Sequence, residues 1–68
     1  MLIAEHENGY ICTAHDWGNA EDYVCGTIRF GGPEDYWHFW PASDCRQLTA
    51  SDLKILSDKL VELNRMIR

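Results

Sequence analysis

Six side chains in this sequence are of the types that bind metal ions or act as nucleophiles. They are three histidines and three cysteines: His6, Cys12, His15, Cys25, His38 and Cys45. Among these, Cys12, Cys25 and His38 fall where neighbouring predicted strands could bring them to one sheet face, as zinc ligands or a redox-linked set. However, no paired C-x-x-C is present, and structural zinc sites normally have four ligands. We therefore predict no metal ion and no cofactor.

Catalysis is not expected either. A cysteine and a histidine on neighbouring strands could pair, but nucleophilic catalysis also needs a third group that orients the base. A chain of 68 residues is too short to enclose such a pair in a deep, dry pocket. The adjacent carboxylates Glu21-Asp22 and Glu34-Asp35 fall in predicted loops, where solvation is the expected state. The sequence predicts a protein that is not an enzyme.

Four strands are expected to position these residues. They alternate in side-chain character, are separated by turn-forming residues, and span residues 2–7, 10–15, 23–30 and 36–40. Asn8-Gly9 predicts a tight hairpin, because both central residues of a type I′ turn need positive φ. Polar loops are expected at 16–22 and 31–35, and Pro41 ends the last strand.

One helix follows the strands. Thr49 and Asp52 form a close variant of the capping box, and Leu48 is placed to pack on Leu53 as a hydrophobic staple. An apolar stripe at helical spacing then runs through Leu53, Leu56, Leu60, Leu63 and Ile67. The sequence thus predicts a single α+β domain over residues 1–68: a four-stranded antiparallel β-meander followed by one C-terminal α-helix packed on one sheet face, or ββββα.

Alternation divides the strand residues between two sheet faces. The more apolar set is expected to meet the helix: Ile11, Val24, Ile28, Phe30, Trp37 and Phe39. The other set is rich in aromatic and thiol groups: Tyr10, Cys12, Ala14, Tyr23, Cys25, Thr27, Arg29, Tyr36, His38 and Trp40. Because one helix covers one face, the second set is expected to form a partner or self-association surface, unless residues 41–48 fold over it.

Charge and cysteine content narrow the class of protein further. The net charge is −5, and residues 1–45 hold eight Asp or Glu and one Arg. Such a surface disfavours direct nucleic-acid binding and attracts a basic partner. The odd count of three cysteines fits reduced thiols in a cytoplasm, and residues 1–7 lack the basic region and apolar run of a signal peptide. No membrane-spanning segment is expected.

The leading hypothesis is therefore a small acidic, cytoplasmic protein-binding module. We expect a regulator or inhibitor that docks a basic-surfaced protein partner, for example a nucleic-acid-binding protein; phage- and mobile-element-encoded inhibitors often share this size and charge. The expected binding residues are Tyr10, Trp17, Tyr23, Tyr36 and Trp40, with Glu21, Asp22, Glu34 and Asp35 in the loops. The alternatives are a homodimeric structural or accessory subunit, or a zinc- or redox-linked module that uses Cys12, Cys25 and His38.

Overall fold

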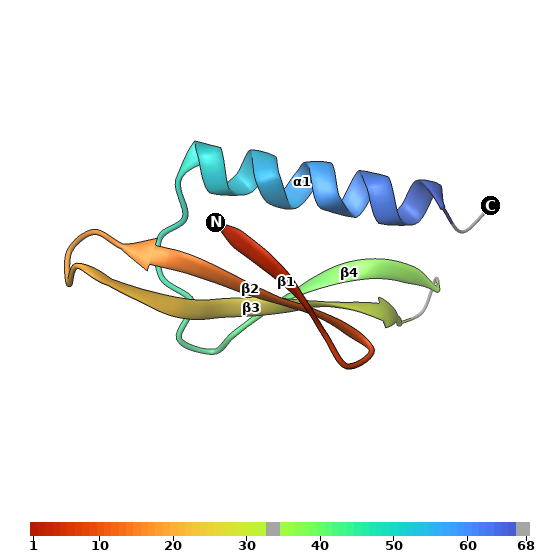
Figure 1. Ribbon diagram of the computed structural model, residues 1–68, viewed down its shortest axis with the longest axis horizontal. Coiled ribbons are helices and arrows are strands. Elements are labelled where there is room, and N and C mark those ends of the chain that lie inside the picture. Colours follow the sequence, from red (N-terminus) through yellow and green to blue (C-terminus); the bar gives the residue numbers. More distant parts are fainter. Residues whose placement is uncertain (33–34, 67–68) are drawn as a thin grey trace.

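The computed structural model describes residues 1–32 and 35–66 and confirms the predicted ββββα architecture. Its elements are β1 (Leu2–His6), β2 (Gly9–Asp16), β3 (Glu21–Gly31), β4 (Tyr36–Pro41) and α1 (Ala50–Arg65). The strands form one antiparallel sheet in the order β1-β2-β3-β4. As Figure 1 shows, α1 lies over one face of this sheet, and the β2–β3 hairpin extends past the N-terminal end of the helix.

A β-bulge in β3 decides which side chains face α1. Thr13 is opposite Val24, but Cys12 is opposite Gly26, so Cys25 is an extra residue in the longer strand. Both cysteines are fully buried beneath the helix. The face toward α1 carries Ile3, Tyr10, Cys12, Ala14, Tyr23, Cys25, Ile28, Phe30, Trp37 and Phe39.

The predicted division between faces is confirmed for β4 and the second half of β3, but it is wrong for β2 and the first half of β3. Ile11 and Val24 lie on the face away from α1. The residues that face the helix instead are Tyr10, Cys12, Ala14, Tyr23 and Cys25. The extra residue at the bulge breaks strict alternation in β3, so residues before it exchange faces relative to those after it. β2 alternates without interruption, and its faces differ from the prediction because the register places Tyr10 opposite Ile28 and Ile11 opposite Thr27.

Gly26 allows an aromatic ring to lie directly on the strand. A Cβ at this position would come within 2.6 Å of both the Phe39 Cζ atom and the Trp40 carbonyl oxygen. Glycine inside a strand often marks such a close approach or a bulge, and here it marks both. The absence of a side chain therefore brings Phe39 into the core cluster.

The first hairpin forms where the sequence predicts it, but its turn lies one residue earlier. His6 pairs with Gly9, so Glu7 and Asn8 are the central residues, and positive φ occurs at Glu7 (51°) rather than at Asn8 and Gly9. Positive φ at the first central residue only is the pattern of a type II′ turn. Gly9 instead lies in β2, where a Cβ would collide with the Ile28 carbonyl oxygen.

The predicted loop at 16–22 is also shorter than expected, because Glu21 and Asp22 belong to β3. Their carboxylates therefore extend from a strand end rather than from a flexible loop. Asp35 lies in the β3–β4 turn with a φ of 52°. Glu34 lies outside the described residues.

The helix begins as predicted with a capping box. The Asp52 N–H donates to Thr49 Oγ1 and the Thr49 N–H donates to Asp52 Oδ2, both at 3.1 Å. Asp52 Oδ1 also accepts from the Met1 ammonium at 2.8 Å. These hydrogen bonds, that of the ammonium foremost, hold the pKa of the Asp52 carboxyl below its ordinary value. Asp52 thus joins the start of β1 to the start of α1.

The apolar stripe of α1 is displaced from the predicted one. Leu56 and Leu63 are buried and Leu60 is half-buried, but Leu53 is 53% exposed and does not belong to the core. The buried position at the start of the stripe is Asp52. The Met1 ammonium balances the charge of its carboxylate, and the capping box supplies its remaining hydrogen bonds. Ile67, the last residue of the predicted stripe, lies outside the described residues.

Asn64 of α1 protects the outer edge of β4. Its Oδ1 accepts the Trp37 N–H at 2.8 Å and its Nδ2 donates to the Trp37 carbonyl at 3.2 Å. An exposed edge strand is a template for pairing with another chain, and occupied backbone groups remove that template. At Pro41 the edge also lacks an N–H donor. Pairing of β4 with a further strand is therefore obstructed at both positions.

We expect Gly26→Ala to destabilise the fold by about 1–3 kcal/mol, because the new Cβ must displace the Phe39 ring or the Trp40 backbone. Urea unfolding measures the free energy. Gly18→Ala is the matched control, since its Cβ would meet a single atom, Asp16 Oδ1, at 3.3 Å. Equal losses for the two variants would contradict the proposed packing.

We expect Asp52→Asn to weaken the fold at pH 7 by about 1.5–3 kcal/mol, the scale of hydrogen bonds to a charged group. The folded-state pKa of Asp52 is lowered, so its stabilisation is complete above the unfolded pKa of about 3.9 and is lost as the pH falls through the folded value. The variant should therefore lose less stability than the wild type between pH 5 and acidic pH. Asp58→Asn, which removes an exposed carboxylate from the same helix, should retain the wild-type acid profile.

Candidate protein-interaction surface

The sheet face opposite α1 is the candidate functional site, and we call it the open face. The pairing of the strands places these side chains on it: Leu2, Ala4, His6, Ile11, Thr13, His15, Asp22, Val24, Thr27, Arg29, Tyr36, His38 and Trp40. The residues that link β4 to α1 do not cover it. Cys45 and Leu48 pack against the core on the helix side, where the Arg46 N–H also donates to Tyr23 Oη at 3.0 Å.

Cross-strand pairing arranges the open face in rows. From the β2–β3 loop toward the β1–β2 turn, four rows are His15–Asp22, Leu2–Thr13–Val24, Ala4–Ile11–Thr27–Trp40 and His6–Gly9–Arg29–His38. The two middle rows form an apolar centre, in which Leu2 is 69% exposed, Trp40 is 51% exposed and Val24 is 49% exposed. Half-exposed apolar and aromatic side chains that adjoin in this way are typical of an interaction surface.

The end of the open face near the β2–β3 loop carries a negative charge. The Asp22 side chain is 73% exposed, and its Oδ1 lies 2.8 Å from His15 Nδ1. The His15 ring also packs edge-on against Trp17, with centroids 4.3 Å apart. Trp17 thus lies in the loop beside the open face, exposed to solvent, and not among its rows.

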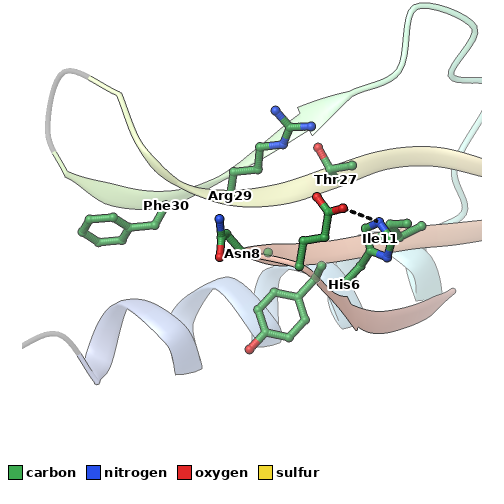
Figure 2. A pocket seen from close by; sticks show the side chains of 9 residues that line it. His6, Asn8, Ile11, Thr27, Arg29 and Phe30 are labelled. Atoms are coloured by element: carbon green, nitrogen blue, oxygen red, sulfur yellow. Dashed lines mark ion pairs between the residues drawn. The ribbon is translucent and has the colours of Figure 1, made fainter.

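The opposite end carries Arg29, His6 and His38, with the Glu7 carboxylate beside them. Arg29 and Thr27 point away from α1 beside a shallow hollow, which Figure 2 shows together with His6. The hollow has a volume of about 280 Å³. It lies over Gly9, which separates His6 from Arg29 in their row and has no side chain to fill the space. His6 Nε2 is 4.0 Å from a Glu7 carboxylate oxygen. Within residues 1–32 and 35–66, Arg29 has no ion-pair partner.

Two of the predicted aromatic binding residues, Tyr36 and Trp40, lie on the open face as expected. The placement of Tyr10 and Tyr23 on that face is wrong. Lys59 Nζ lies 4.8 Å from the centre of the Tyr10 ring, and the Arg46 guanidinium lies 4.5 Å from the centre of the Tyr23 ring. Both tyrosines therefore contribute to packing on the helix side.

The acidic groups at the strand ends that flank the β2–β3 loop are partly neutralised by Arg46, a residue that the sequence did not indicate. Arg46 Nη1 lies 2.6 Å from Asp16 Oδ2 and 3.2 Å from Glu21 Oε1. These contacts, with Glu21 first, raise the pKa of the Arg46 guanidinium. Hydrogen bonds from Asn19 above all hold the pKa of Asp16 below its ordinary value. Among the predicted acidic binding residues that the structure describes, Asp22 is therefore more accessible than Glu21, and Asp35 is also exposed.

The predicted grouping of Cys12, Cys25 and His38 on one face is wrong. The two cysteines are buried under α1, and His38 lies on the open face with its Nδ1 atom 2.8 Å from the Tyr36 carbonyl oxygen. Burial, and secondarily the neighbouring Cys25, raises the pKa of the Cys12 thiol to about 11. Burial likewise raises the pKa of Cys25. Protonated, buried thiols are poor nucleophiles and poor metal ligands.

In the described part of the chain, no group of three His, Cys, Asp or Glu side chains is arranged to hold a metal ion. No described helix has the length and apolar character needed to cross a membrane. No protein-family model, curated protein or solved structure matches this chain. The fold and the open face therefore define the class: a small α+β protein with one sheet face covered by a helix and the other uncovered.

Sequence reasoning missed Leu2, Ile11 and Val24 as open-face residues. For Val24 the available signal was Gly26 in the middle of a strand, because glycine at such a position often accompanies a bulge. A bulge beside Gly26 changes the face of Val24 and transfers it from the expected core to the surface.

We expect Cys12 and Cys25 to react with a thiol reagent at neutral pH no faster than the protein opens, because both thiols are buried and have raised pKa values. Cys45 is only partly buried and should react first. A thiol titration of Cys45→Ser with and without denaturant measures the remaining two directly. Rapid labelling of this variant without denaturant would support the redox-linked alternative instead.

Proposed function

We propose that this chain is a small, non-enzymatic protein-binding module that docks a protein partner through its open face and thereby regulates or inhibits that partner. The observation that supports the proposal is the apolar centre of the open face. Leu2, Val24 and Trp40 remain 49–69% exposed there, although the same chain buries apolar side chains under α1. Burial of such side chains by a partner is favourable at roughly 25 cal/mol per Å².

Trp40 is the proposed main anchor. Tryptophan combines a large apolar area with an N–H donor and is enriched among residues whose truncation weakens binding most. It adjoins Thr27 in its row, with Tyr36 further along the same strand and face. Tyr10 and Tyr23 are not part of the proposal, because both rings pack on the helix side.

We further propose that the partner presents a basic surface around the contact. The net charge of −5 and exposed carboxylates near both ends of the open face support this proposal. Asp22 lies at one end, and Glu7 and Asp35 lie in the turns at the other. Complementary charge mainly accelerates association and excludes wrong partners. A nucleic-acid-binding protein is a suitable partner, and the three free thiols support a reducing cytoplasm as the setting.

We expect Trp40→Ala to weaken partner binding by tenfold or more, the scale of losing about 1.4 kcal/mol or more at a central anchor. The immobilised wild-type chain first captures proteins from a cell extract, and these are identified. The affinity of each purified partner is then measured for the wild type and for the variant. Leu53→Ala is the matched control, since Leu53 is 53% exposed on α1 and Trp40 is 51% exposed on the open face.

Circular dichroism and thermal melting establish that both variants are folded before their affinities are compared. Equal affinity of wild type, Trp40→Ala and Leu53→Ala for the captured partner would refute docking through the open face.

A further inference from the structure

Asp22 and Arg29 lie at opposite ends of the open face, with the apolar centre between them and Glu7 and Asp35 in the turns beside Arg29. Asp22 is exposed at one end, and Arg29 is exposed at the other without an ion-pair partner among the described residues. The rows between them expose Leu2, Val24 and Trp40. Such a surface is complementary to itself after a half-turn, which is the requirement of an interface shared by two identical chains.

The spacing of the rows determines how two copies fit. On β2 the four rows are marked by His15, Thr13, Ile11 and Gly9, which are two residues apart. Consider a two-fold axis that is parallel to the sheet, runs across the strands and passes between the Thr13 and Ile11 rows. This axis places the Asp22 row of one copy over the Arg29 row of the other. The same rotation places the two apolar rows over one another. An axis parallel to the strands would instead oppose like charges.

We propose that a second copy of this chain covers the open face in the absence of another partner, forming a face-to-face dimer with two symmetric Asp22–Arg29 ion pairs. Packed sheets lie about 10 Å apart with strand directions within about 30°, which this arrangement permits. The inference rests on the proposed function, because it assigns an occupant to the same face. Dimer dissociation then exposes the face to a heterologous partner.

The structure favours face-to-face over edge-to-edge association at β4. Asn64 occupies the backbone groups of Trp37 at that edge. Four strands about 4.8 Å apart and four rows about 6.7 Å apart give the open face a projected area of roughly 400 Å². Two such faces bury roughly 800 Å² in total, which is below the roughly 1,200–2,000 Å² of stable interfaces, so the dimer is expected to be weak and to dissociate on dilution.

The test is a pair of charge reversals and their mixture, followed by light scattering over a dilution series from about 500 µM to about 5 µM. The wild-type mass is expected to approach twice 7.9 kDa at the concentrated end and to fall on dilution. Asp22→Arg opposes two positive charges and Arg29→Glu opposes two negative charges, so each variant alone should require at least tenfold higher concentration to dimerise. Mixing the two variants makes both ion pairs attractive again and should restore the dimer.

The matched controls reverse the same charges away from the open face. Asp44→Arg in the segment before α1 and Arg65→Glu on α1 should dimerise like the wild type, because both positions are exposed outside the proposed interface. A wild-type chain that stays monomeric over the whole series overturns the inference. Single charge reversals that leave the dimer unchanged also overturn it. A mixture of the two folded variants that remains monomeric overturns it as well.

The failure of this inference and the failure of the proposed function give different results. A monomeric wild type that still binds its captured partner through Trp40 overturns the second copy as the occupant and leaves the proposed function standing. A dimer restored by mixing, together with partner binding that Trp40→Ala does not weaken, supports the inference and removes heterologous docking through the open face.

Discussion

The packing of α1 against one sheet face is the interaction on which the rest of this structure depends. A helix of 16 residues is about 24 Å long, enough to extend over one face of four short strands. Leu56 and Leu63 meet the small side chains of Cys12, Ala14 and Cys25 there, so the helix lies close to the sheet. The segment that precedes α1 contributes to the same side. The second face is consequently left to solvent or to another chain.

The bulge at Cys25 then determines which side chains each face receives. It allows Tyr23, Cys25 and Ile28 to share the covered face although their spacing departs from strict alternation. The same irregularity directs Val24 outward, next to Thr13 and Leu2. A single inserted residue thereby adds to the core and enlarges the apolar centre of the open face, which links the stability of the fold to its proposed binding surface.

Charge is organised by the same architecture. Arg46 holds Asp16 and Glu21 near the β2–β3 loop, and Asp52 holds the Met1 ammonium at the start of α1. These ion pairs neutralise part of the chain's excess negative charge within the molecule. What remains is Asp22 at one end of the open face and the row of Arg29, His6 and His38 at the other, where Glu7 and Asp35 lie in the adjoining turns. An apolar centre with polar surroundings is the usual composition of a reversible protein interface.

The sequence by itself determined the features that depend on neighbouring residues: the number and order of strands, the capping box at Thr49 and Asp52, and the alternation of β4. It predicted Trp40 and Tyr36 on the open face for the same reason. Only the tertiary structure decided the bulge at Cys25, the position of Gly9 within a strand and the stacking of Arg46 on Tyr23. Each of these depends on a partner distant in the chain, because strand register and face are set by cross-strand packing rather than by local preference.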